Sequence, residues 1–320
     1  MLAGEDLTIL PISDLHIGAE DSVLTPESLL SEKDLSNSTI HNWQRIAAQT
    51  ALDRLMKEPD IVVINGDVRD NVAPDNEPGS KKDQAITKYS LKLLERWVTA
   101  DSDKPFYYVL GNHDGNTSYD FKKRLLQLAE RHDNLHVTDY GVKIGDILFT
   151  HGDLQTRQIT PADRADWTIG REHDLALLGK NKVQTTTAML QRFYEMMEKE
   201  ELAKDFVILR HGEPASLLTL EELRTTPYVM LGHSHMHMDA IQPQARVGAT
   251  FGINSGSFLR LPKKRMEDDD ELNSPEDLKQ QMLHLKQGKL DAASRAFPAV
   301  ASWTELSYEK RDSSSFPIER

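Results

Sequence analysis

The chain has 320 residues, of which 38% are hydrophobic and 28% are charged, an ordinary composition for a soluble globular protein. Its formal net charge of −13 disfavours nonspecific binding to nucleic acid, because neutralising backbone phosphates requires clustered Lys and Arg. The sequence contains no cysteine, which excludes disulfides and thiolate metal ligands, and no apolar run is long enough to cross a bilayer.

The N-terminal residues 1–6 lack the basic start and apolar stretch of a secretory signal. We therefore expect a cytoplasmic protein, although an effector delivered by a specialised secretion system would look the same. The oligomeric state has no signature in the sequence.

The first half of the chain alternates short apolar runs with amphipathic stretches, which is typical of an α/β layered fold. Runs rich in β-branched or aromatic residues and bounded by Pro or Gly predict buried strands over 7–12, 60–64 and 106–110. Apolar residues at helical spacing predict helices over 43–57, 86–97 and 121–131.

Two further strand patterns follow, over 135–138 and 142–150, and they read as a hairpin that turns near 139–141. The next stretch, about 155–205, loses strand signals and is predicted to be a helical insertion. Its stripe of Met189, Phe193, Met196 and Met197 favours core packing over an apolar cap on a substrate.

Strand patterns return over 206–209, 228–231 and 250–261. Residues 1–261 are therefore predicted to form one catalytic domain that contains the insertion. Residues 262–320 are predicted to be a C-terminal extension, with a charged stretch, a helix over 278–290 and a strand within 299–308.

Five short polar motifs follow predicted strands. Ligands gather beyond the carboxyl ends of strands in open α/β sheets, so these motifs are expected to converge on one place. In chain order they are Ser13-Asp14-Leu15-His16, Asn65-Gly66-Asp67, Gly111-Asn112-His113-Asp114, Thr150-His151-Gly152-Asp153 and Gly232-His233-Ser234-His235.

Carboxylate, amide oxygen and imidazole together form a mixed oxygen and nitrogen shell, which suits Mn, Fe, Zn, Co or Ni and suits Ca poorly. The spacing in Asp14-Leu15-His16 and His233-Ser234-His235 puts two ligands on the same side of an extended backbone. Glycine beside Asp67, Asn112, His151 and His233 allows sharp turns and a close approach to the ions.

The five motifs, in this order, resemble those of the calcineurin-like metallophosphoesterase superfamily over roughly two thirds of the chain. The resemblance implies a four-layer α/β sandwich of two mixed sheets flanked by helices. It also implies two divalent metal ions, with manganese as the first expectation and Fe, Zn, Co or Ni as alternatives. The implied ligands are Asp14, His16 and His235 for one metal, Asn112, His151 and His233 for the other, and Asp67 as a bridge.

The same resemblance implies a dinuclear phosphoesterase in which a metal-bound hydroxide attacks phosphorus. His113 would assist the leaving group, and Asp70 would orient His113, with Asp114 and Asp153 as competing partners. The substrate would be a phosphorylated small molecule or a nucleotide.

The sequence is also compatible with two other functions. A helical insertion between the last two motifs resembles that of UDP-2,3-diacylglucosamine hydrolases, which suggests a nucleotide-sugar pyrophosphatase, but that branch usually carries Arg where this chain has His113. A metal-organised, non-catalytic scaffold is the alternative of another class, and the retained His113 counts against it. Four basic residues of the insertion could grip a substrate phosphate or be solvent-exposed helix charges: Arg164, Arg171, Lys182 and Arg192.

Overall fold

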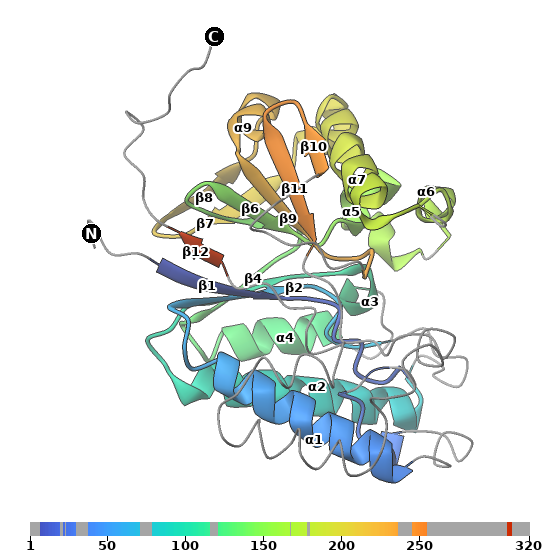
Figure 1. Cartoon of the computed structure of the whole chain (residues 1–320), viewed down its shortest axis with the longest axis vertical. Coiled ribbons are helices and arrows are strands. Elements are labelled where there is room, and N and C mark those ends of the chain that lie inside the picture. The colour runs from blue at the N-terminus through green and yellow to red at the C-terminus, as the bar shows by residue number, and fades with distance from the viewer. Residues whose placement is uncertain are drawn as a thin grey trace.

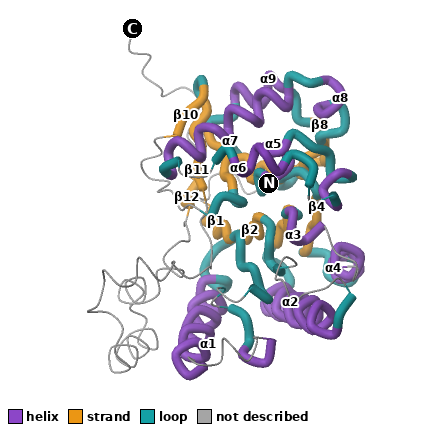
Figure 2. The backbone as a smooth tube through the Cα atoms, turned by 90° about the vertical axis from the view of Figure 1, so that its right-hand side faces the viewer, coloured by secondary structure: helices purple, strands orange, loops and turns teal. Residues whose placement is uncertain are grey.

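The computed structural model describes residues 7–19, 22, 24–29, 38–70, 79–115, 121–166, 168–177, 180–235, 245–254 and 306–308. In this part of the chain, two β-sheets lie face to face and helices cover their outer faces, which makes four layers (Figure 1). The view turned by 90° shows the strands enclosed between the same two sets of helices (Figure 2). The predicted four-layer α/β sandwich is confirmed.

The first sheet has five strands, of which β1 to β4 run parallel and β12 pairs antiparallel with β1. In spatial order the strands are β12 (Leu306–Tyr308), β1 (Leu7–Ile12), β2 (Ile61–Asn65), β3 (Phe106–Val109) and β4 (Leu135–Thr138). The parallel arrangement brings the carboxyl ends of β1, β2 and β3 to the same edge.

The second sheet has seven strands and is mixed, with β6, β9 and β11 parallel to one another. In spatial order they are β10 (Ala245–Val247), β11 (Thr250–Asn254), β9 (Tyr228–Leu231), β6 (Ile147–Thr150), β5 (Val142–Ile144), β7 (Val207–Arg210) and β8 (Glu213–Leu217).

Helices of different sizes cover the sheets and connect them. The first sheet is covered by α1 (Ser38–Leu55), α2 (Lys81–Ala100) and α4 (Phe121–Ala129). The second is covered by α7 (Lys182–Met197) and α9 (Leu220–Thr225). The short helices are α3 (Asn112–Gly115), α5 (Asp153–Arg157), α6 (Arg171–Leu175) and α8 (Glu200–Ala203), with 3-10 turns η1 (Glu27–Leu29) and η3 (Asp163–Ala165). Among the described helices, none combines the length and apolarity that a membrane crossing requires.

Alternation along the strands of the first sheet divides their side chains between two cores. In β2, Ile61 and Val63 face the second sheet, whereas Val62 and Ile64 pack against the helices. Both faces are apolar because both are covered, which explains why this strand reads as a continuous hydrophobic run. The core between the sheets also contains Phe149 and Ile253 from the second sheet.

The hairpin predicted over 135–150 is wrong. The strand β4 pairs with β3 in the first sheet, whereas β5 and β6 pair with each other in the second. The tight turn lies at Gly145 and Asp146, between Ile144 and Ile147, and residues 139–141 instead carry the chain from one sheet to the other. Gly145 has a positive φ of 56°, a backbone conformation that hairpin turns commonly require and that glycine adopts without strain.

The stretch of 155–205 is helical in its described residues, as expected. The four residues of its apolar stripe are buried in the core between α7 and the second sheet, so the interpretation as core packing is confirmed. Met189 packs directly below Gly152, where a Cβ would lie 2.7 Å from its Cε. The helix α7 therefore supports the loop that carries the fourth motif.

Other differences concern the second half of the chain. The strand β8 was not predicted, because all five of its residues are exposed and it contains Pro214. Of the expected strand 250–261, residues 250–254 form β11, and the remainder lies outside the described residues. The expected helix over 278–290 also lies outside them, while β12 falls within the expected strand 299–308.

Candidate metal centre

All five motifs lie at the carboxyl ends of strands that end at the same side of the sandwich. The first three follow β1, β2 and β3 of the first sheet, and the last two follow β6 and β9 of the second. Backbone hydrogen bonds continue between the loops: Asp14 N donates to Gly66 O, and Gly232 N donates to His151 O. The motifs are thus held together by backbone hydrogen bonds that continue the pairing of β1 with β2 and of β6 with β9.

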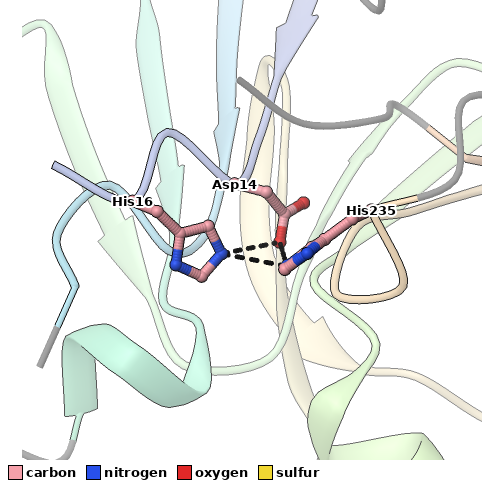
Figure 3. A group of neighbouring side chains, drawn as sticks. All are labelled: Asp14, His16 and His235. Atoms are coloured by element: carbon pink, nitrogen blue, oxygen red, sulfur yellow. Dashed lines mark hydrogen bonds and ion pairs between the residues drawn. The ribbon is translucent and has the colours of Figure 1, made fainter. Parts of the chain in front are cut away.

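One group of side chains consists of Asp14, His16 and His235, whose potential ligand atoms lie within 4.8 Å of one another. Nε2 of His235 is 3.3 Å from Oδ1 of Asp14 and 2.9 Å from Nε2 of His16. Figure 3 shows the two rings and the carboxylate turned toward a common point, with His235 arriving from the opposite sheet. The backbone N–H of His233 donates to the carboxylate of Asp14 at 3.2 Å, which joins the first motif to the fifth.

A second group contains Asp67, His151 and His233, with Asn112 beside it. Nε2 of His151 lies 3.1 Å from Oδ2 of Asp67 and 3.3 Å from Oδ1 of Asn112. Nδ1 of the same ring lies 2.8 Å from the carbonyl oxygen of Asn65. A carbonyl oxygen only accepts, so Nδ1 carries a proton, and Nε2 is the nitrogen whose lone pair would face the centre once that nitrogen has lost its own proton.

Asp67, a member of the second group, also faces the first group. Its Oδ2 is 3.9 Å from Nε2 of His16, on the side of the first group, and 3.1 Å from Nε2 of His151, on the side of the second. This oxygen is buried and accepts no well-aligned hydrogen bond among the described residues. Burying a charged oxygen without a hydrogen bond costs free energy, and binding a cation offsets that cost.

His113 and Asp70 form a pair at the rim of the centre. Nδ1 of His113 lies 2.8 Å from Oδ1 of Asp70, and its Nε2 lies 3.9 Å from Oδ2 of Asp67. Oδ1 of Asp70 is also 3.7 Å from Nδ1 of His16. The competing partners of His113 are engaged elsewhere: Asp114 accepts from the backbone N–H groups of Asp67 and Gly111, and Asp153 pairs with Arg164.

Left-handed backbone is concentrated at these residues. In the described part of the chain, six residues other than glycine have a positive φ, and five of them are predicted metal ligands. Such conformations are costly for most residues and persist where the surrounding structure enforces them, often at functional sites. The five are Asp14 at 54°, His16 at 46°, Asp67 at 53°, His233 at 62° and His235 at 57°.

Two glycines make the close approach of the loops possible. A Cβ at Gly66 would lie 2.3 Å from Nδ1 of His151, and one at Gly111 would lie 2.1 Å from Oδ1 of Asp67. Both distances are far below van der Waals contact. Glycine beside Asp67 and Asn112 therefore permits the loops to pack closely, and the close approach to the ions stays a prediction.

The buried carboxylates give the centre a strong affinity for positive charge. Burial opposes charge on His16, but Asp14 and Asp70 outweigh it and raise its pKa to about 10. Burial likewise opposes charge on His151, and Asp67 outweighs it and raises that pKa to about 10. The same imidazoles hold the pKa of Asp67 well below its usual range, although burial acts in the opposite direction. In the absence of metal, protons on the imidazoles therefore neutralise these carboxylates, and two divalent cations fit the same donor set.

The basic residues proposed to grip a substrate phosphate lie in different environments. Arg164 is buried and is bound to both carboxylate oxygens of Asp153, at 2.7 and 3.0 Å. It is therefore neither a solvent-exposed helix charge nor a residue free to grip a substrate phosphate. Arg171 and Lys182 are exposed, and Arg192 is half-buried beside His173. Arg164 instead anchors the start of the insertion to the carboxylate two residues after His151.

Sequence reasoning missed Asp174, an acidic residue of α6 in the insertion. Its Oδ1 lies 3.0 Å from Nε2 of His233. Burial opposes its ionisation, but His233 and Arg157 outweigh that effect and lower the pKa of Asp174 to about 2. The segment 166–177 carries no motif, so only the tertiary structure brings this carboxylate to the fifth motif.

Residues 7–237 match the calcineurin-like phosphoesterase family. The chain belongs to the calcineurin-like phosphoesterase family. Phosphoesterases are hydrolases that act on phosphate ester bonds, and that is the class of enzyme to which this family assigns the chain. The region of the match contains all five motifs and both sheets up to β9.

A protein of Arcobacter nitrofigilis, described as a probable glycerophosphodiester phosphodiesterase GpdQ, is 26% identical to this phosphoesterase over 140 residues. The aligned stretch covers 43% of this chain and 42% of that protein, so the likeness spans less than half of either.

Metal uptake by this phosphoesterase is expected to release protons. His16 and His151, each with a pKa of about 10, are protonated near neutral pH when no metal is bound, and they must lose those protons to become ligands. Filling the centre near pH 7 should therefore release about two protons per chain, and the apparent metal affinity should fall as the pH falls. Calorimetric titration with Mn²⁺ in buffers of different ionisation enthalpy measures the number of protons.

The metal-free protein should show the opposite pH dependence of stability. A raised folded pKa stabilises the chain fully below the unfolded value of 6.5, and this contribution is lost as the pH rises toward about 10. The increase in melting temperature on adding Mn²⁺ should consequently become larger as the pH rises from 6.5 toward about 10. A metal-induced shift that is independent of pH would contradict this assignment of the protons.

Proposed function

We propose that this protein is a dinuclear metal-dependent phosphoesterase that hydrolyses a small-molecule phosphodiester. One metal would be held by Asp14, His16 and His235, and the other by Asn112, His151 and His233, with Asp67 between them. The observation that carries the proposal is the arrangement of donors from both sheets around the buried, unsatisfied Oδ2 of Asp67. Manganese is our first choice of metal, since a mixed oxygen and nitrogen shell suits it. The cytoplasm is the compartment that we propose.

When bound, the two cations would supply positive charge against the phosphoryl oxygens and activate water as the nucleophile. The residues of the chain do the remaining work. His113 would present a proton at Nε2, because Asp70 lies 2.8 Å from its Nδ1 and orients the ring. From the rim of the centre, where the side chain of His113 is 13% exposed, this proton would pass to the leaving oxygen.

The preference for a diester follows from the relative described as a probable glycerophosphodiester phosphodiesterase, and it is a proposal for this chain. The pair of His113 and Asp70 supports a catalytic function rather than a scaffold, since a scaffold has no need of a proton donor. It also counts against the pyrophosphatase alternative, whose resemblance implies Arg at the position of His113.

The test is an assay of metal-stripped protein after adding back Mn²⁺, Zn²⁺, Fe²⁺, Co²⁺ or Ni²⁺. The substrates are bis-p-nitrophenyl phosphate, p-nitrophenyl phosphate, a glycerophosphodiester and a nucleotide-diphosphate sugar. Metal-dependent hydrolysis that favours the two diesters is the expected result. Preference for the nucleotide-diphosphate sugar would support the pyrophosphatase alternative. Two bound ions without turnover of any substrate would support the scaffold.

A further inference from the structure

Asp174, an acidic residue of the helical insertion, contacts a predicted ligand of the candidate metal centre. Asp174, on α6, places Oδ1 3.0 Å from Nε2 of His233, and its other oxygen is bound by Arg157 of α5 at 2.7 and 2.8 Å. Arg157 is buried and lies at the end of the short helix α5, which begins at Asp153, the last residue of the fourth motif. A chain of charged contacts therefore runs from the loop of His151 through the insertion to His233.

The position of α6 depends on these polar contacts. None of its residues is buried, so apolar packing does not fix it in place. Nδ1 of His173 lies 3.2 Å from the carbonyl oxygen of Arg157, and Gly170, with a φ of 69°, lets the helix begin against the backbone of Arg157. A Cβ at Gly170 would lie 2.6 Å from that carbonyl oxygen. The figures show α5, α6 and α7 beside one another at the same side of the second sheet (Figures 1 and 2).

The contact with Asp174 determines which nitrogen of His233 is available to bind a metal ion. An ionised carboxylate only accepts hydrogen bonds, so Nε2 of His233 must carry the proton that faces Asp174. The lone pair of the ring is then on Nδ1. For His151, the carbonyl oxygen of Asn65 accepts the hydrogen bond from Nδ1, which leaves Nε2 as the nitrogen that can bind a metal ion. The two imidazoles of one metal shell are thus oriented by partners of different origin, one from β2 and one from the insertion.

We propose that Asp174 is a positioning residue of the metal centre, through which the insertion fixes the ring and the tautomer of His233 for binding the second metal. This inference rests on the proposed function, because it assumes that His233 is a ligand. Partners that orient ligating histidines typically change metal affinity by roughly 10–100-fold when they are removed. The effect should be confined to one of two ions, since Asp174 contacts His233 and not Asp14, His16 or His235.

The test compares the wild-type chain with Asp174→Asn, and uses Glu172→Gln as a matched control on the same helix, where the Glu172 side chain is 72% exposed. Equilibrium dialysis against Mn²⁺ with metal analysis gives the stoichiometry and both affinities. In Asp174→Asn, one ion should bind roughly 10–100-fold more weakly and the other unchanged. The electron paramagnetic resonance signal of a coupled manganese pair should give way to that of single ions at limiting metal. The metal-free variant should melt at a lower temperature, because an amide lacks the charge that pairs with the buried Arg157 and with His233. A positioning role is therefore read from the unequal loss of the two ions, which a general destabilisation would not produce.

The outcomes separate this inference from the proposed function. Two ions bound by Asp174→Asn as tightly as by the wild type would overturn the inference, as would an equal loss of both ions. A similar loss in Glu172→Gln would also overturn it, because the effect would then belong to the charge of α6 in general. A wild-type chain that binds no Mn²⁺ would overturn the proposed function, and the inference with it.

Discussion

Replacement of Asp67 by asparagine is expected to empty the metal centre and abolish turnover. Oδ1 of Asp67 accepts from the backbone N–H of His113 at 2.8 Å, and an amide oxygen would keep this bond, so the fold should survive. The amide NH₂ would replace Oδ2, which lies 3.1 Å from Nε2 of His151 and is the proposed bridge between the cations. We expect turnover to fall by at least roughly 10²–10³-fold, the scale for removing one charge-stabilising group from an active site.

The measurements are bound metal per chain and hydrolysis of bis-p-nitrophenyl phosphate at saturating Mn²⁺. Asp103→Asn, the same chemical change at an exposed position, is the matched control and should behave as the wild type. An Asp67→Asn protein that keeps two ions and most of its activity would show that Asp67 does not bridge them.

Replacement of His113 by glutamine is expected to affect catalysis without affecting metal binding. Its imidazole is directed by Asp70 and belongs to neither ligand shell in the proposed assignment. Loss of a positioned proton donor typically costs roughly 10²–10⁴-fold in rate. That loss should be large for an alkoxide leaving group, as in a glycerophosphodiester, and small for p-nitrophenolate, which leaves without a proton.

The decisive comparison is therefore the ratio of kcat values for the two kinds of leaving group in the wild type and in His113→Gln. Asp70→Asn should shift the ratio in the same direction by a smaller amount, because the donor remains and only its orienting partner changes. Equal losses for both leaving groups would contradict the role as a proton donor. A fall in bound metal would instead assign His113 to a ligand shell.

Much of the centre was predictable because its positions follow from strand ends. Each motif directly follows a short buried strand, and parallel strands deliver their carboxyl ends to one edge. The sequence thus predicted that Asp14, Asp67 and His151 would converge, and the structure brings them together. Their roles as ligands stay predictions.

What the sequence could not predict depends on contacts between distant segments. Asp174 and Arg157 are ordinary helix charges until the insertion folds back on the fifth motif. Arg164 was expected to bind a substrate phosphate or to be a solvent-exposed charge. It is instead buried and paired with Asp153, a partner eleven residues away that local periodicity cannot identify. The true hairpin does have a local signal, since Gly145-Asp146 is a typical turn pair in the middle of the segment 142–150.

The division of the candidate ligands between the two sheets has a consequence for how the protein responds to damage far from the centre. Asp14, His16, Asp67 and Asn112 follow strands of one sheet, while His151, His233 and His235 follow strands of the other. Cations bound by both sets would cross-link the sheets, so that metal affinity and the cohesion of the core between them are thermodynamically coupled. A cavity introduced at Ile253 or Phe149 would then weaken metal binding without touching a ligand, and excess metal would restore activity to such a variant.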